Sequence, residues 1–481
     1  MKNKMINKMV ISLLILATLF SVAACSRKDE DYRNSLIDKY NPQGASIVLI
    51  EGGQIAEVRN YGRANVEKNI PVTNKTTFKI ASISKVVTAY TVMQLVDEGK
   101  LDLDAPISSY LTRWKLPSSE FHNDKVTLRT LLSHTSGVSG SDEIYEKSLP
   151  DVATALENKQ IHLKREPGEE FEYSEFSGFG ICQLVIEEVT GEKFEDYVVK
   201  NVFQKLGLLD TSFANKSVGD CFMATPYAGL GKAVDPAPLV MTGAGGVTTT
   251  STDLAKFTIA LMDYYNNDTE MFQIQKNTQS NIGECCLGIF AQTLSDGRKV
   301  YEHNGTLTGW NAQMVFEPHS KNGMVIVTNS DKAYYLTYEM MEKWGQKVLG
   351  EPIEISAIAS LSKNTDNVAI IMALIDGLAL IILLTRVYRK KLKNIGKRYK
   401  GTVIVFLLTT IISGSCFFLF YSDIPFDLLF GMKDYCLFTF FPPSLRIILF
   451  ELVVFFGILI ARTRFVRNKK PMTKIAEEKH I

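Results

Sequence analysis

Three long apolar runs occupy the last quarter of this 481-residue chain and limit what it can fold into. They span residues 368–384, 402–421 and 447–461, and Asp376 is the one charged residue in the first. A helix of about 20 apolar residues crosses the roughly 30 Å hydrocarbon core of a bilayer. The sequence therefore predicts a transmembrane region of about three helices at residues 368–461, preceded by a juxtamembrane linker at 351–367.

Basic residues mark the predicted orientation of these spans. Residues 386–400, between the first two runs, and residues 462–470, after the third, are rich in Lys and Arg. The positive-inside rule places both stretches in the cytoplasm, so residues 462–481 are a basic cytoplasmic tail. Three spans then leave everything before the linker outside the cell. The apolar segment 426–443 keeps the number of spans open, because it fits an interfacial or re-entrant piece.

The N-terminus has the parts of an export signal. Lys2, Lys4 and Lys8 precede an apolar run at 10–24, which ends in small residues before Cys25. We therefore expect a signal peptide at residues 1–24. Residues 22–25 resemble a bacterial lipobox, which implies lipidation of Cys25; an uncleaved signal anchor is the alternative. Both interpretations export the residues after the signal, beginning with a polar tether at residues 25–41.

Composition argues against several classes of function. The net charge is +1, so there is no general case for nucleic-acid binding. The seven cysteines include no Cys-x-x-Cys motif, and the six histidines include no close pair. Since metal sites need such clustered ligands, we expect neither a metal nor another cofactor.

The exported part has strands at its beginning and end with helices between them. Two strand-like runs at 45–50 and 54–62 flank a Gly-bearing turn and predict a hairpin. Helical patterns follow at residues 78–99, 127–132, 179–189, 194–206 and 254–262, then strand patterns at 311–316 and 323–328, and a last helix at 332–349. The late strands must return to the first hairpin. We therefore predict one α/β (α+β) domain at residues 42–350, with an inserted helical region.

A Ser-x-x-Lys pattern occurs twice, at Ser82/Lys85 and at Ser360/Lys363. The second copy lies in the predicted linker and is interpreted as chance. The first opens an apolar helix, where residues three apart share a face and Lys85 can reach Ser82. A partly buried lysine can act as the base that a serine nucleophile needs, and a helix N-terminus offers N–H groups to an oxyanion.

Several further motifs accompany this pair in a fixed order. The pair lies in the stretch FKIASISKVVTAYTVMQLVDEGKLDLDAPISSYL. The motifs that follow it are LLSHTSG, FEYSEFSGFGICQLVIEEVTG, GAGGVTTTSTDLAKF and HNGTLTGW. Together they resemble the serine β-lactamase and penicillin-binding-protein family, in particular its class C β-lactamases, D-alanyl-D-alanine peptidases and esterases. The similarity covers about residues 42–350, and it implies an antiparallel sheet flanked by helices.

The resemblance implies a role for each motif residue. Ser82 attacks a carbonyl and becomes acylated, while Lys85 and Tyr173 share the proton transfers. The backbone N–H groups of Ser82 and Thr306 form the oxyanion hole. A tyrosine near a lysine ammonium can ionise more easily, which would help it act as a base.

Two positions depart from the family pattern. Glu175 stands where the second motif, Tyr-x-Asn, has asparagine, and near Lys85 its carboxylate would keep that lysine protonated. His303, with Gly305, stands where the family has a Lys/His-x-Gly triplet on the strand that binds substrate. The imidazole could donate to a substrate carboxylate, and histidine here tells against an efficient β-lactamase. We therefore expect Glu175, His303 and Gly305 to bind substrate.

The leading hypothesis is a membrane-anchored, extracytoplasmic serine hydrolase that acts through an acyl-enzyme. Its partners would be a peptide, an ester or a β-lactam-like small molecule, together with membrane lipid. The rival is a catalytically weak or inactive receptor that binds a peptide or β-lactam in the same pocket and signals through its transmembrane helices to a protein partner. Ser82 and Lys85 favour the hydrolase, while Glu175 and the multi-span tail favour the receptor.

Overall fold

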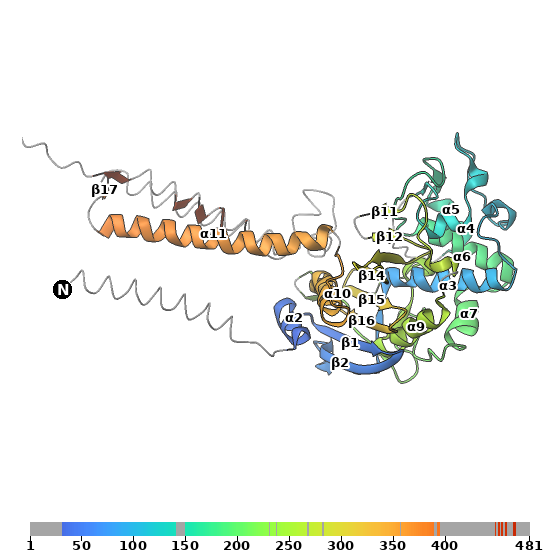
Figure 1. Cartoon of the computed structure of the whole chain (residues 1–481), viewed down its shortest axis with the longest axis horizontal. Coiled ribbons are helices and arrows are strands. Elements are labelled where there is room, and N and C mark those ends of the chain that lie inside the picture. The colour runs from blue at the N-terminus through green and yellow to red at the C-terminus, as the bar shows by residue number, and fades with distance from the viewer. Residues whose placement is uncertain are drawn as a thin grey trace, which may run out of the picture. The chain divides into compact units, whose positions relative to one another are not determined.

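The computed structural model describes residues 31–140, 150–229, 231–236, 238–266, 269–280, 283–355, 357–388 and 392–394, with short pieces between 448 and 467 (Figure 1). The chain divides into two compact units, residues 1–41 and 42–481. The described part of the first unit is the helix α2 (Tyr32–Tyr40), which falls in the predicted polar tether. Asp31 caps this helix by accepting a hydrogen bond from the Arg33 N–H.

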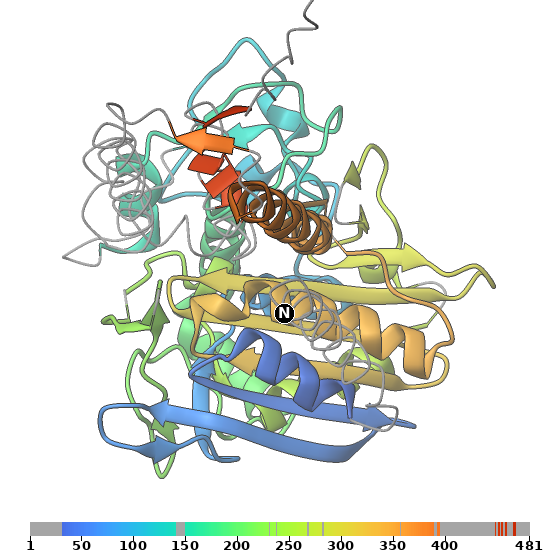
Figure 2. The ribbon, with the colours of Figure 1, turned by 90° about the vertical axis from the view of Figure 1, so that its left-hand side faces the viewer.

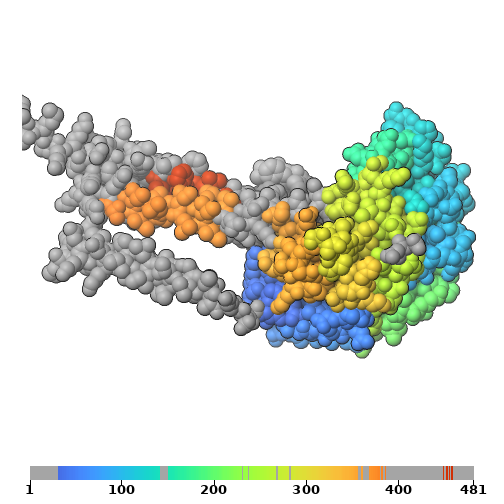
Figure 3. Space-filling model, in the orientation of Figure 1, coloured from blue at the N-terminus to red at the C-terminus, as the bar shows by residue number. Residues whose placement is uncertain are grey.

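A nine-stranded antiparallel sheet forms the centre of the second unit, in the order β11-β12-β13-β14-β15-β16-β1-β2-β3. Figure 2 shows the first strands (blue) beside the late ones (yellow to orange), and Figure 3 shows these parts of the chain adjoining on one face. The strands are β1 (Gly44–Glu51), β2 (Gln54–Asn65), β3 (Ile70–Pro71), β11 (Gln279–Ser280), β12 (Gly283–Cys285), β13 (Phe290–Thr293), β14 (Lys299–Leu307), β15 (Trp310–Glu317) and β16 (Asn322–Thr328).

Pairing of β16 with β1 confirms that the late strands return to the first hairpin. Ala45 lies opposite Thr328, and the register continues to Ile50 opposite Gly323. Helices α9 and α10 contact β15 from the two sides of the sheet (Figure 1). Every residue of β15 is buried, because both faces of this strand are covered.

The helices and shorter strands build the rest of this unit. The helices are α3 (Ser84–Asp97), α4 (Leu128–Leu132), α5 (Val152–Asn158), α6 (Ser177–Thr190), α7 (Phe194–Val198), α8 (Thr242–Gly245), α9 (Ser251–Tyr264), α10 (Tyr334–Val348) and α11 (Ala357–Tyr388). Short helical turns are η1 (Ala81–Ile83), η2 (Ile107–Ser109), η3 (Asn123–Lys125), η4 (Val199–Phe203), η5 (Glu270–Phe272) and η6 (Asp331–Ala333). Short strands are β4 (Thr76–Lys79), β5 (Val138–Ser139), β6 (His162–Leu163), β7 (Phe222–Met223), β8 (Tyr227–Ala228), β9 (Lys232–Ala233), β10 (Thr248–Thr250), β17 (Leu392–Asn394) and β18 (Phe465–Arg467).

The start of the nucleophile helix differs from the predicted one. The helical pattern was expected from residue 78, but Phe78 and Lys79 lie in β4, which pairs with β10. Phe78 packs edge-on against Trp310 of β15, with ring centroids 6.3 Å apart. Because this strand pairing outweighs the local helical pattern, α3 begins only at Ser84.

The predicted membrane and targeting segments lie largely beyond the described residues. The helix α11 contains the first apolar run, and no helix within the described ranges is both long and apolar enough to cross a membrane. The predicted signal peptide, Cys25, the run at 402–421 and the segment 426–443 lie outside the described residues. The run at 447–461 is described only in pieces.

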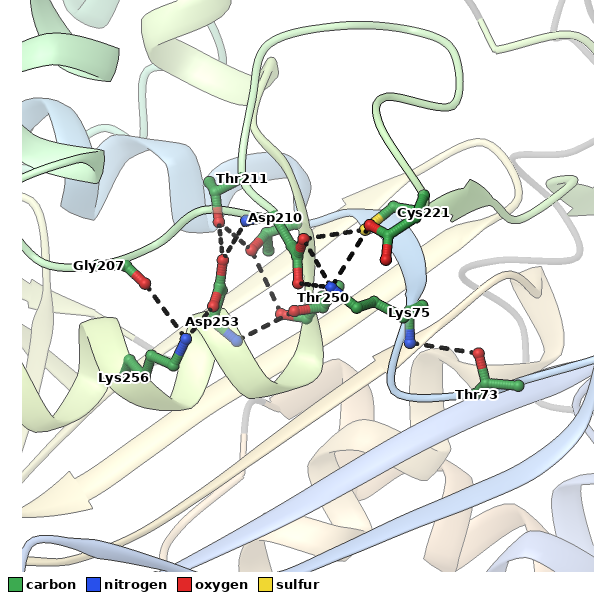
Figure 4. Close-up of polar contacts among 11 residues, drawn as sticks. Thr73, Lys75, Gly207, Asp210, Thr211, Cys221, Thr250, Asp253 and Lys256 are labelled. Atoms are coloured by element: carbon green, nitrogen blue, oxygen red, sulfur yellow. Dashed lines mark hydrogen bonds and ion pairs between the residues drawn. The ribbon is translucent and has the colours of Figure 1, made fainter.

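A buried carboxylate joins the start of α9 to the loop after η4 (Figure 4). Asp253 is 1% exposed, and its carboxylate accepts hydrogen bonds from the Asp210 N–H and from Lys256 Nζ, each at 2.7 Å. The Thr250 side chain caps the same helix by accepting from the Asp253 N–H. Since α9 packs on the sheet, this carboxylate connects the loop to the core.

We expect Asp253→Asn to destabilise the protein by about 2 kcal/mol, because the Asp210 N–H and the Lys256 ammonium then lose a buried, charged acceptor. Urea unfolding can be followed by the fluorescence of Trp114, Trp310 and Trp344, which are all buried. Asp263→Asn on the exposed side of the same helix is the control. Equal stability of the two variants would contradict the structural role of Asp253.

Candidate active site

The nucleophile lies in a tight turn between β4 and α3. Ala81, directly before it, is buried and has a φ of 46°, a left-handed conformation that non-glycine residues rarely adopt. Ser82 is partly exposed in η1, while its neighbours Ile83 and Ser84 are fully buried. The turn therefore presents the Ser82 hydroxyl from an otherwise closed core.

Lys85 lies one helical turn after Ser82, as the spacing predicted. Its Nζ donates to Ser82 Oγ at 3.0 Å and to the Ala244 carbonyl at 3.2 Å. The Lys85 side chain is fully buried, and this burial lowers its pKa to about 8. A lysine with such a pKa is neutral in a useful fraction of molecules near neutral pH, so it can accept the Ser82 proton.

Aromatic rings surround the buried ammonium. Nζ of Lys85 lies 5.0 Å from the ring centroid of Tyr173 and 5.7 Å from those of Phe176 and Phe179. Ring faces attract a cation and partly replace the water it has lost. The rings thus help to stabilise the protonated form of Lys85. A proton-transfer group needs this, because it must exist in both the protonated and the neutral form.

Tyr173 takes a different protonation state from the expected one. Burial raises the pKa of Tyr173 well above the ordinary value, and the charge of Glu175 raises it further. A hydrogen bond with Ser82 lowers this pKa, but by less than burial raises it. The expectation that the Lys85 ammonium eases ionisation of Tyr173 is therefore not met. Tyr173 is a neutral phenol beside Ser82 and can pass on a proton, while Lys85 is the better base.

Glu175 acts on Lys85 in the expected direction but does not decide its state. The residue is exposed, and its charge raises the pKa of Lys85. Burial is the larger influence, so the net pKa of Lys85 still lies below that of a free lysine. The carboxylate lowers the fraction of neutral Lys85 at a given pH, but burial still leaves part of it neutral near pH 7.

His134, which belongs to the LLSHTSG motif, supports the loop that carries Tyr173. Its Nδ1 accepts the Ser174 N–H at 2.9 Å, and its ring stacks on Tyr173 with centroids 4.4 Å apart. The Ser174 side chain in turn accepts the Gly178 N–H at the start of α6. These contacts hold Tyr173 next to Ser82.

Strand β14 closes the other side of the site. A Cβ built on Gly305 would lie 2.0 Å from the Ile80 carbonyl oxygen, so only glycine lets this strand approach the nucleophile turn. This approach brings the neighbouring Thr306 toward Ser82. The predicted oxyanion hole needs the backbone N–H groups of these two residues close together. The Thr306 hydroxyl lies 3.0 Å from the amide oxygens of Asn304 and Asn311.

His303 of β14 faces the same interior. It is 2% exposed, and its Nδ1 lies 2.7 Å from the Asn304 carbonyl oxygen. Burial and the nearby positive charge of Lys85 lower the pKa of His303 to about 3. The imidazole is therefore neutral wherever Lys85 can act as a base.

The Ala244 carbonyl is a contact that reasoning from sequence did not identify. It belongs to α8 in the GAGGVTTT stretch, whose motif was noted without a role for that backbone atom. The same helix is held by Gln183, whose side-chain oxygen accepts the Gly243 N–H at 3.0 Å. A backbone acceptor leaves no signal in side-chain identity, which explains the omission.

A second polar cluster, of Lys75, Asp210, Asp220 and Cys221, lies elsewhere in the same unit (Figure 4). The Lys75 ammonium lies 3.0 Å from Asp210 and 3.5 Å from Asp220, and Cys221 Sγ donates to Asp210 at 3.1 Å. Although two carboxylates and a thiol are metal-ligand types, the Lys75 ammonium already forms ion pairs with both carboxylates. Cys182, Cys221, Cys285 and Cys286 are free thiols.

Comparison with known proteins adds a family to this geometry. The family model described as Beta-lactamase matches residues 33–337. Protein flp of Staphylococcus aureus (strain COL) is 26% identical over 458 aligned positions, covering 90% of this chain and 89% of its own length. The solved penicillin binding protein from Bacillus halodurans is 25% identical with a TM-score of 0.54, over 63% of this chain and 95% of that one.

A second solved structure, the octameric penicillin-binding protein homologue from Pyrococcus abyssi, has a TM-score of 0.56 at 24% identity. The match covers 67% of this chain and 78% of that one. At this identity the similarity establishes the fold alone.

We expect Glu175→Gln to lower the pKa of Lys85 further, because removing a nearby negative charge destabilises the ammonium. Reaction of Ser82 with a fluorophosphonate should then become roughly two- to threefold faster at pH 7, and its pH profile should shift to lower pH. Glu169→Gln makes the same charge change on the same loop and should leave the profile in place. A shift to higher pH in Glu175→Gln would contradict the assignment of Lys85 as the base.

Proposed function

The chain belongs to the beta-lactamase family, and from this membership we propose that it is a serine hydrolase that reacts through an acyl-enzyme on Ser82. The observation that carries the proposal is the 3.0 Å hydrogen bond from Lys85 Nζ to Ser82 Oγ. Burial lowers the pKa of this lysine to about 8. A nucleophile and a matched base are thus already in contact.

The proposed reaction has two halves. Neutral Lys85 takes the Ser82 proton as Oγ bonds to the substrate carbonyl carbon, and the N–H groups of Ser82 and Thr306 bind the developing oxyanion. The bond to the leaving group then breaks, and that group departs with the proton. Water next adds to the ester carbonyl and gives a proton to Lys85, which returns it to Oγ as the acid product leaves.

We propose peptides or esters as substrates, in the manner of the D-amino-acid peptidases and esterases of the family. The neutral His303 at the place of a lysine makes this class a better fit than efficient β-lactam hydrolysis. The hydrogen-bonded Ser82/Lys85 pair supports an enzyme over the receptor hypothesis.

A fluorophosphonate and a fluorescent β-lactam applied to the full chain test the proposal. We expect labelling by the fluorophosphonate, abolished in Ser82→Ala and retained in Ser360→Ala, which removes the serine of the second Ser-x-x-Lys copy. Absence of any Ser82-dependent adduct with both probes would refute the hydrolase and leave the receptor.

We also propose that the hydrolase domain is anchored on the outer face of a bacterial membrane. Three apolar runs with flanking basic segments support this arrangement, as does the predicted export signal before Cys25. The described side chains of α11 are in keeping with it, since Ile370, Leu374 and Leu378 are each at least 60% exposed.

Protease added to intact protoplasts tests the topology. We expect the region 42–350 to be degraded, while a tag attached after Ile481 stays protected until the membrane is permeabilised. Cys25→Ser should abolish incorporation of labelled fatty acid. Protection of the 42–350 region in intact protoplasts would exclude the proposed orientation.

A further inference from the structure

Glu302 is a buried carboxyl group to which the proposed reaction gives no role. It lies on β14 directly before His303 and is 1% exposed. Alternate residues of a strand face the same side of a sheet, so Glu302, Asn304 and Thr306 share the face opposite to that of His303. Asn304 contacts Thr337 of α10, which places this face of β14 against that helix. Glu302 therefore lies behind the strand that closes the active site.

A chain of hydrogen bonds joins Glu302 to Thr306. Gln313 Nε2 donates to Glu302 Oε2 at 2.5 Å, and the side-chain oxygen of Gln313 accepts from Asn304 Nδ2 at 3.1 Å. The side-chain oxygen of Asn304 accepts in turn from the Thr306 hydroxyl at 3.0 Å. These two amides, Gln313 and Asn304, are called the amide chain below. They connect the buried carboxyl group with the residue whose N–H belongs to the proposed oxyanion hole.

Every hydrogen bond of the amide chain donates toward Glu302. Asn304 Nδ2 also lies 3.0 Å from the Ala312 carbonyl oxygen, which can only accept, so this contact fixes the orientation of the Asn304 amide. The Gln313 amide must then turn its oxygen to Asn304 and its nitrogen to Glu302. A carboxylate only accepts hydrogen bonds, and its charge strengthens them, so the ionised form of Glu302 terminates the chain best.

The Thr306 hydroxyl has two acceptors within reach. The side-chain oxygens of Asn304 and Asn311 both lie 3.0 Å from it, and its single proton can serve only one of them. A charge on Glu302 strengthens the amide chain, because hydrogen bonds in series polarise one another in a low-dielectric interior. The charge therefore favours the bond to Asn304, which ties Thr306 to its own strand.

The groups that face Glu302 do not exchange protons with it. Phe290 of β13 and Val315 of β15 lie opposite it, and α10 contacts the amide chain through Met341 as well as Thr337. None of these side chains titrates. The charge of Glu302 also acts on Tyr173, whose phenol stays neutral.

The charge on Glu302 changes near neutral pH. Burial raises the pKa of this carboxyl group to about 7, and the hydrogen bond from Gln313 lowers it by less. A carboxyl group ionises as the pH rises through its pKa. The charge that terminates the amide chain is therefore gained between about pH 6 and pH 8 and lost below this range.

We propose that Glu302 is a positioning residue, whose carboxylate holds the oxyanion-hole residue Thr306 in place through the amide chain. The inference rests on the proposed acyl-enzyme at Ser82 and adds a group that lies just before the HNGTLTGW motif. Acylation of Ser82 should accordingly depend on the ionisation of Glu302 as well as on that of Lys85.

The rate at which a fluorophosphonate labels Ser82 in the full chain, followed from about pH 5.5 to 9, tests this role. In the wild type two ionisations should raise the rate, those of Glu302 and Lys85, whose pKa values are about 7 and about 8. Glu302→Gln keeps the shape and the acceptor without a charge, so its profile should show the ionisation of Lys85 alone. We expect its maximal rate to fall about tenfold at an unchanged half-saturating concentration, less than the ~10²–10³-fold loss on removing an oxyanion-hole donor.

Two further variants separate positioning from general damage to the core. Glu317→Gln is the control, because Glu317 is a buried glutamate of β15 that accepts the N–H groups of His319 and Ser320. Its rate and profile should match the wild type. Gln313→Met breaks the amide chain while Glu302 can still titrate. Combined with Glu302→Gln it should cost no more than either change alone, because both act through the same bonds.

The outcomes distinguish this role from the proposed function. An unchanged profile in Glu302→Gln, or additive losses in the double variant, would overturn the positioning role and leave the acyl-enzyme in place. Absence of labelling at Ser82 in the wild type would instead remove the proposed function. Urea unfolding of each variant, followed by tryptophan fluorescence, separates a slower reaction from a loss of folded protein.

Discussion

Burial of the Lys85 ammonium is the constraint on which the rest of the site depends. Taking a charge out of water costs several kcal/mol unless other groups replace the lost contacts. Here Ser82 and the Ala244 carbonyl accept its hydrogen bonds, and three aromatic rings surround it. These contacts come from η1, from α8, and from the loop before α6 together with its first turn, so the lysine is accommodated only when distant parts of the chain have come together.

The protonation states of the neighbouring groups follow from that one charge and from burial. His303 and His134 have lowered pKa values because each lies buried near Lys85, and burial keeps the Tyr173 phenol protonated. The site thus contains neutral rings around one titrating lysine. Such an arrangement suits a reaction in which one proton moves from Ser82 to Lys85 and on to the leaving group.

Local geometry explains which parts of the site could be predicted. Ser82 and Lys85 are three residues apart at a helix start, so their contact follows from helical spacing. Tyr173 and His303 were predicted as site residues from the order of the family's motifs, and that order gave no distance between the two side chains. The Ala244 carbonyl was missed because a backbone acceptor has no side-chain signature. The start of α3 was predicted too early because pairing of β4 with β10 is a long-range interaction.

The sequence by itself determined the order of strands and helices, the Ser82/Lys85 pair and the expectation of an exported, anchored hydrolase. These features depend on short-range periodicity and on motif residues that can be read along the chain. Only the tertiary structure decided the chemistry of the site. Burial lowers the pKa of Lys85, and hydrogen bonds through two amides connect Glu302 to Thr306. Desolvation and hydrogen-bond partners arise from packing between distant segments, so no local pattern encodes them.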